Sequence, residues 1–119
     1  MGKVDEFLAA ADLCLLHAYQ NASISRAYYA MFQAAIAAMK AADIESENWS
    51  HQALQAAFAR ELVHRRKVYP SSFVNALHPV MQVRLRADYE VQDVSMKVAS
   101  RVLARAQEFV ERIREETRL

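Results

Sequence analysis

The longest apolar region of the chain predicts a helix that is buried on most of its sides. It covers about residues 23–42, and a helix without a polar face must be covered by other elements. Ser23 or Ser25 is its expected N-cap, because a serine hydroxyl accepts a hydrogen bond from the free amides of the first turn. We therefore expect this helix to be the central element. Its apolar positions are Ile24, Tyr28, Met31, Phe32, Ala35, Ile36 and Met39.

Two other segments repeat apolar residues every three or four positions, which indicates amphipathic helices. One covers about residues 51–63, with Ser50 as its expected N-cap, and the other covers about residues 94–116. The predicted buried positions of the first are Leu54, Ala57, Phe58 and Leu62. Those of the second are Val94, Val98, Val102, Ala106, Phe109 or Val110, and Ile113.

Polar and proline-containing segments separate these elements. A first helix is predicted over residues 4–19 and ends at the polar residues 20–23, and residues 43–50 are a polar connector. After the basic residues 64–67, Tyr69 and Pro70 break the chain, and Ser71 or Ser72 is expected to cap a fourth helix. Pro79 predicts either a kink in that helix or a fresh start with Pro79 in its first turn, because proline lacks an amide and clashes with the preceding turn.

This pattern predicts an all-α protein, an antiparallel up-and-down bundle of about five helices that forms a single domain over residues 1–119. The sequence has only 1 glycine and 2 prolines, so few positions favour turns. Alanine, arginine, glutamate and glutamine lose little side-chain freedom in a helix. No strand pattern competes, and short connectors favour antiparallel neighbours.

Charge and cysteine content narrow the function and the location. The chain has 15 Lys and Arg against 14 Asp and Glu, a net charge of +1. That balance argues against a dedicated electrostatic binder of nucleic acid but is compatible with a local basic patch. A single cysteine, Cys14, excludes an intrachain disulfide. The longest apolar stretch, residues 27–39, is too short to span a bilayer, so we expect a cytoplasmic protein with no membrane contact.

The sequence contains no motif for a metal, a cofactor or a covalent nucleophile. Its four histidines, of which none forms an H-x-x-x-H pair, lie on separate predicted elements. The only glycine, Gly2, excludes a glycine-rich phosphate loop, and Cys14 has no evident activating partner. We therefore expect neither a metal nor a cofactor.

Arg26, Tyr28 and Tyr29 form the first of three polar groups that are candidates for a binding site. Successive side chains on a helix diverge by about 100°, so Tyr28 and Tyr29 cannot face the same pocket. One tyrosine is expected in the core. The other, with Arg26 one turn away, is expected to line a groove or a subunit interface. Burial of an aromatic ring contributes about 1.5–3 kcal/mol, so either tyrosine also has a purely structural explanation.

The second group is Trp49, Ser50 and His51, at the start of the third predicted helix. The amide end of a helix disfavours a positive charge, so His51 is expected to be neutral there. A capping or packing role explains this histidine without any function.

The third group lies on the fourth helix. Arg84 and Asp88 are four residues apart and are expected to pair, whereas Arg86 faces elsewhere and pairs with Tyr89 or Glu90. An exposed pair of this kind contributes only about 0–1 kcal/mol. Two arginines, a carboxylate and a phenol this close together suit phosphate binding equally well. Because of the break at Pro79, the sequence leaves open which arginine faces inward.

The segments that carry these three groups resemble, in this order, the HEPN superfamily and especially its small stand-alone prokaryotic proteins. They are SRAYYAMFQAA at residues 25–35, SHQALQAAF at residues 50–58 and RLRADYE at residues 84–90, followed by a long closing helix with EFVERI. The resemblance covers about residues 23–110. It implies a bundle of about five helices, commonly a homodimer, and many relatives act beside a minimal nucleotidyltransferase in toxin–antitoxin-like pairs.

The resemblance also implies that a ribonuclease activity is worth considering. The better-understood members are metal-independent ribonucleases with an arginine followed four to six residues later by a histidine, which act on the phosphate and the 2′-hydroxyl of RNA. This sequence lacks that motif, because neither Arg84 nor Arg86 has a histidine at that distance and Asp88 and Tyr89 stand there instead. The sequence therefore does not decide whether the chain is an enzyme.

The leading hypothesis is a HEPN-like module that binds a nucleotide or RNA phosphate and partners a minimal nucleotidyltransferase. The alternatives are a ribonuclease with a degenerate motif and a purely structural adaptor. A tyrosine would also offer the partner a hydroxyl acceptor for nucleotidyl transfer. The expected site residues are Arg84 and Arg86 on the phosphate, Asp88 orienting an arginine, Tyr89 or Tyr29 on the base, and Arg26 and His51 in support.

Overall fold

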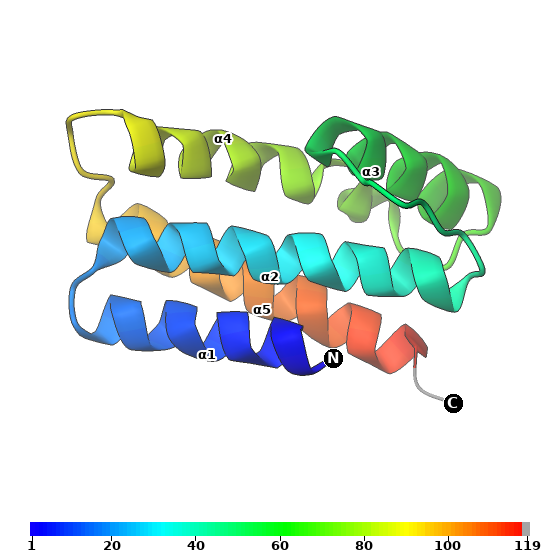
Figure 1. The fold of residues 1–119 in the computed structure, drawn as a ribbon, viewed down its shortest axis with the longest axis horizontal. Helices are drawn as coiled ribbons and strands as arrows, with labels where there is room; N and C mark the ends of the chain where they lie inside the picture. Colours follow the sequence, from blue (N-terminus) through cyan, green and yellow to red (C-terminus); the bar gives the residue numbers. More distant parts are fainter. Residues whose placement is uncertain (118–119) are drawn as a thin grey trace.

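The predicted all-α architecture is confirmed by the computed structural model, which describes residues 1–117 and contains no strand in that range (Figure 1). The long helices run in alternating directions along the chain, as in an up-and-down bundle (Figure 1). The elements in order are α1 (Gly2–Leu16), α2 (Gln20–Ala41), α3 (His51–Phe58), the π-helix η1 (Ala59–Arg65), the 3-10 helix η2 (Ser71–Asn75), α4 (Leu77–Tyr89) and α5 (Met96–Thr117).

Helix α2 is the central element, as predicted. It packs against α1, α3, α4 and α5, and the chain crosses the whole length of the bundle in it (Figure 1). Coverage on so many sides is what an all-round apolar helix requires. Among its fully buried residues are Ile24, Ala27, Tyr28, Ala30, Met31, Ala34, Ala35 and Met39.

The start of α2 differs from the prediction. The helix begins at Gln20, so Ser23 and Ser25 lie inside it and neither is its N-cap. The buried Ser23 hydroxyl instead donates a 2.7 Å hydrogen bond to the carbonyl oxygen of Ala11 in α1. Asn21, which resembles a loop residue in the sequence, accepts from the amide of Val94 at 3.0 Å. Tertiary hydrogen bonds therefore extend this helix through residues that favour a turn by themselves.

The third predicted helix is confirmed in position but not in type. The Ser50 hydroxyl accepts from the amide of Ala53 at 3.0 Å, which confirms the predicted N-cap. The α-helical hydrogen bonding ends at Phe58, and the wider η1 continues to Arg65. All four residues predicted for its buried face are buried: Leu54, Ala57, Phe58 and Leu62.

The fourth helix starts afresh at Leu77, with Pro79 in its first turn, so this alternative was correct and the kink was wrong. Proline is tolerated there because the amides of the first turn have no partner within the helix. The predicted caps Ser71 and Ser72 do not cap α4, because they lie in η2. The last helix is confirmed, and its buried residues include Val102, Ala106, Phe109, Val110 and Ile113. Within residues 1–117 no helix is long and apolar enough to cross a membrane.

Candidate functional site

Arg84 is the inward-facing arginine of α4, which answers the question that the sequence left open. Its side chain is only 12% exposed, and its Nε donates to an Asp88 carboxylate oxygen at 3.0 Å, one helical turn away. The start of α4 at Leu77 fixes the phase of the helix, so that Arg84 points toward α2. A carboxylate bound to Nε leaves the two terminal nitrogens of the guanidinium to face other groups.

The aromatic pair of α2 receives this guanidinium. The Cζ atom of Arg84 lies 4.9 Å from the ring centre of Tyr29 and 5.8 Å from that of Tyr28. A guanidinium at this distance from an aromatic ring is attracted to the electron-rich face. Tyr28 is fully buried, which confirms the predicted core tyrosine, and Tyr29 is half-buried. The two tyrosines were expected to face different surroundings, but both rings lie beside Arg84 and His51.

A second guanidinium approaches the same ring. The Cζ atom of Arg26 lies 5.3 Å from the ring centre of Tyr29 and 5.4 Å from that of Phe7 in α1. No carboxylate forms an ion pair with Arg26 within residues 1–117. Tyr29 therefore has a cation from its own helix and another from α4 next to it, while the group contains one carboxylate, Asp88. We call Arg26, Tyr29, Arg84 and Asp88, together with His51, the arginine–tyrosine cluster.

His51 enters this cluster from the first turn of α3. Its Nδ1 lies 2.6 Å from the hydroxyl oxygen of Tyr28, and its ring centre lies 4.6 Å from that of Phe32. Burial lowers the pKa of His51 below its ordinary value of 6.5, and the positive charge of Arg84 lowers this pKa further. Burial likewise raises the pKa of Tyr28 to about 12. Both side chains are therefore neutral near pH 7, as predicted for His51.

The direction of the hydrogen bond between these two side chains depends on the tautomer of His51. When the Tyr28 hydroxyl donates to Nδ1, a neutral imidazole carries its own proton on Nε2, which is then a hydrogen-bond donor and suits an anionic ligand. When the ring proton is on Nδ1, this nitrogen donates to the Tyr28 hydroxyl oxygen and Nε2 is an acceptor.

A groove of about 460 Å³ lies between α3 and α4. It is lined by His51 of the cluster and by Met81. Met81 also contacts Arg84, with 3.8 Å between its sulfur and a terminal nitrogen of the guanidinium. Several amide and imidazole side chains border this groove, and they can donate or accept hydrogen bonds to a ligand. They are Gln52, Gln55, His78 and Gln82.

Five of the seven expected site residues come together in the cluster, and Arg86 and Tyr89 lie outside it. Arg86 is 56% exposed and its Nε lies 4.0 Å from Glu90, which is one of the two pairings predicted for it. Tyr89 is 75% exposed. Sequence reasoning missed Phe7 altogether, because nothing in the sequence shows that α1 places this ring against Arg26. It also missed the hydrogen bond between Tyr28 and His51, which are 23 residues apart.

A metal centre is not found in this region or elsewhere: within residues 1–117, no group of three or more His, Cys, Asp or Glu side chains is arranged to hold an ion.

Comparison with known proteins identifies a family. The family model described as the HEPN domain matches residues 2–116, nearly the whole chain. No curated protein matches the chain.

The lowered pKa of His51 predicts a pH dependence of stability. A histidine whose pKa is lower in the folded than in the unfolded chain stabilises the fold above pH 6.5 and loses that contribution as the pH falls below this value. We expect the free energy of unfolding, measured by urea denaturation, to decrease between pH 7 and about pH 5. The variant His51→Gln should flatten this decrease.

His64→Gln is the matched control, because His64 is exposed on η1 and has no part in the cluster. It should keep the pH dependence of the wild type. An unchanged slope in His51→Gln would show that proton binding at His51 is not linked to folding.

Proposed function

Because the chain belongs to the HEPN domain family, we propose that it is a nucleotide- or RNA-phosphate-binding module whose binding site is the arginine–tyrosine cluster. One observation carries this proposal: the guanidinium groups of Arg26 and Arg84 both approach the ring of Tyr29, with Asp88 as the one carboxylate beside them. Two guanidinium groups beside one ring, with a single carboxylate, leave an excess of positive charge there, which attracts an anion.

Each residue of the cluster has a role in this proposal. Arg84, oriented by Asp88, presents paired N–H donors to phosphate oxygens, which guanidinium geometry fits. Arg26 supplies a second positive charge, and the Nε2–H of His51 supplies a neutral donor. Tyr29 is half-buried, so part of this residue is accessible to a base. The α3–α4 groove next to His51 gives space for the rest of a nucleotide.

The direct test uses AMP and inorganic phosphate as ligands in thermal-shift and calorimetric titrations. At about one hundred times its Kd, a ligand should stabilise the wild type by about 2.7 kcal/mol. Arg84→Lys keeps the charge but loses the planar fork, so it should weaken AMP binding at least tenfold, by about 1.4 kcal/mol or more. Arg84→Gln should abolish the shift.

Arg86→Gln is the matched control, since Arg86 lies on the same helix but is exposed outside the cluster. It should bind AMP as the wild type does. If Arg84→Gln and Arg86→Gln weaken AMP binding equally, the cluster is not the binding site. If neither AMP nor phosphate stabilises the wild type, the chain is better explained as a structural adaptor.

A ribonuclease is the second candidate, and the meeting of His51 and Arg84 favours it. The chain lacks the arginine-to-histidine motif of the active relatives, but a histidine from α3 and an arginine from α4 both contact the Tyr28–Tyr29 pair. A neutral histidine is competent in acid–base chemistry near pH 7. To act as a base at Nε2, His51 must carry its ring proton on Nδ1, with the Tyr28 hydroxyl oxygen as the acceptor. This tautomer suits catalysis, whereas the tautomer with the proton on Nε2 suits binding of an anion.

The ribonuclease candidate predicts cleavage of an RNA oligonucleotide in the presence of EDTA. His51→Asn and Arg84→Lys should each lower the rate at least a hundredfold, because general acid–base groups and phosphate-stabilising groups contribute about that much or more. Arg86→Gln should retain the activity. A rate no higher than that of a mock preparation from cells lacking the protein excludes this candidate.

We also propose that the chain partners a minimal nucleotidyltransferase, as the resemblance of its sequence implies, and that Tyr89 is the acceptor of a nucleotidyl group. The exposure of Tyr89 supports this proposal. Tyr89 is 75% exposed at the end of α4, near the exposed Val91. The turn between α1 and α2, which carries the exposed Leu16 and Tyr19, lies at the same end of the bundle (Figure 1). Exposed apolar side chains of this kind commonly mark a protein contact. The homodimer implied by the same resemblance stays a prediction.

Affinity purification of the tagged chain from its host, followed by mass spectrometry, tests this pairing. Recovery of a small nucleotidyltransferase supports it. With that enzyme and ATP, the chain should gain the mass of one or more adenylate groups as pyrophosphate is released, and Tyr89→Phe should prevent this. The control is Tyr19→Phe, which replaces another exposed tyrosine at the same end of the bundle. The chain with this substitution should still be modified. Modification that persists in Tyr89→Phe contradicts the proposal.

A further inference from the structure

The π-helix η1 and the two residues after it carry the densest positive charge on the chain. Arg60, Arg65, Arg66 and Lys67 lie within eight positions with one carboxylate, Glu61, so this group has a formal charge of +3 in a chain whose total is +1. All four cations are exposed, and the side chains of Arg60 and Arg65 are 66% and 69% exposed. The remainder of the protein is therefore acidic on balance.

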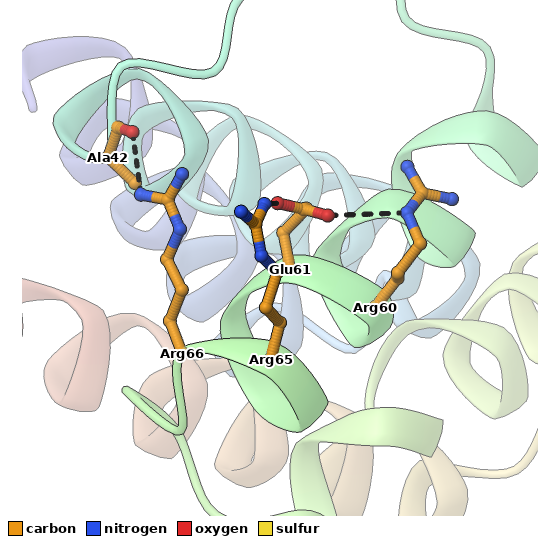
Figure 2. A network of polar contacts seen from close by, with 5 residues as sticks. All are labelled: Ala42, Arg60, Glu61, Arg65 and Arg66. Carbon is orange, nitrogen blue, oxygen red and sulfur yellow. Dashed lines mark hydrogen bonds and ion pairs between the residues drawn. The ribbon is translucent and has the colours of Figure 1, made fainter.

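The π-helical geometry gathers these cations on one side. Residues five apart would diverge by about 140° on an α-helix, whereas a π-helix joins residue i to residue i+5 in a single turn. Arg60 and Arg65, which are five residues apart, flank the same carboxylate, with 3.4 Å and 2.8 Å between their nitrogens and the two oxygens of Glu61. Figure 2 shows their guanidinium groups extending from η1 in the same direction, with Glu61 between them. Single π-turns within helices are often found at functional sites.

Neighbouring residues hold the end of η1 in place. Arg66 donates from a terminal nitrogen to the carbonyl oxygen of Ala42 at 2.9 Å, which ties this segment to the end of α2 (Figure 2). Lys67 adopts a left-handed conformation with φ 54°, which is uncommon for a residue other than glycine. Lys67 borders a groove of about 460 Å³ whose wall also includes Arg112, so positively charged side chains continue around this end of the protein.

The composition of this surface identifies its ligand class. Protein interfaces have an apolar centre, whereas surfaces that bind the nucleic-acid backbone are polar and strongly positive. Among the described residues, no large hydrophobic side chain of 59–67 is exposed; those that are exposed lie in residues 1–19 and 89–96. Residues 59–67 also contain no Phe, Tyr or Trp, so this surface lacks the large aromatic side chains that form stacking platforms for bases.

We propose that Arg60, Arg65, Arg66 and Lys67 form a second phosphate site, which contacts the backbone of an RNA strand without reading its sequence. This proposal rests on the proposed function of the arginine–tyrosine cluster. It adds that the ligand of the cluster is a polynucleotide rather than a free nucleotide. The ten residues from His51 to Arg60 span about 14 Å of helix. A mononucleotide has its phosphate at one point and cannot contact both sites, whereas a strand of several nucleotides can.

The test compares two variants of equal charge change. The first, Arg60→Gln/Arg65→Gln/Lys67→Gln, removes three cations from the basic surface and spares Arg66, which ties η1 to Ala42. The second, Lys97→Gln/Arg101→Gln/Arg105→Gln, removes three exposed cations from α5. The RNA probe is a fluorescent 2′-O-methyl oligouridylate of about twelve nucleotides, long enough to reach both sites and resistant to cleavage at the 2′ position. The second probe is AMP.

The first variant should bind the oligouridylate about tenfold more weakly at low salt, and the slope of log K against log salt should fall by about 2, since each lost contact with a single strand removes about 0.7. The α5 variant should bind it as the wild type does. Both variants should bind AMP normally, because neither touches the arginine–tyrosine cluster. Thermal unfolding of each variant shows whether the loss of binding is separate from a loss of folding.

Four results separate this inference from its alternatives. Equal weakening in both triple variants, or no RNA binding by the wild type, would overturn it. Displacement of the oligouridylate by polyglutamate as readily as by unlabelled RNA would also overturn it, in favour of an acidic protein as the occupant. If the wild type binds RNA through the basic surface but Arg84→Gln binds AMP unchanged, the second phosphate site stands and the proposed function of the cluster fails.

Discussion

Tyr28 lies fully inside the bundle, and its hydroxyl must find a hydrogen-bond partner there, because an unpaired buried polar group costs about 1–3 kcal/mol. The partner is His51, at 2.6 Å, at the first residue of α3. This one contact ties the first residue of α3 to α2, while burial and the charge of Arg84 keep the imidazole neutral. The arginine–tyrosine cluster depends on this contact, because α3 contributes His51 to the cluster only while His51 is held there.

The cluster withdraws charged groups from solvent, which costs the fold free energy. Arg84 is largely withdrawn from solvent, and Asp88 compensates part of its charge within one turn of α4. Arg26 adds a second positive charge at the same tyrosine, with the rings of Phe7 and Tyr29 beside it in place of a carboxylate. Aromatic rings attract a cation without neutralising it. The excess positive charge therefore remains available to an anion, which is the physical basis for assigning a phosphate to this place.

The two ends of the bundle have opposite character, which the net charge of +1 conceals. Exposed apolar side chains gather where α1 turns into α2 and where α4 ends, and exposed cations gather on η1 and the residues after it (Figure 1). The arginine–tyrosine cluster joins α2, α3 and α4 between them. A strand that reaches from the cluster to η1 would leave the apolar end accessible to a protein, so the proposed ligand and the proposed partner do not compete for one surface.

The sequence by itself determined most of the elements, because apolar spacing and capping are local properties: the central helix, the third helix capped by Ser50 and the stripe of the last helix follow from them. At Pro79 it left a kink and a fresh start open. It also gave seven candidate residues and, through the order of the segments that carry them, the family, but it did not separate Arg86 and Tyr89 from the five that form the cluster. Only the tertiary structure decided which of them meet. Whether Arg84 or Arg86 faces inward depends on where α4 starts, and the contact of Phe7 with Arg26 depends on how α1 packs. The spacing of apolar residues could not predict the π-helix either. The register of its hydrogen bonds is set by packing at the end of the bundle rather than by spacing along the chain.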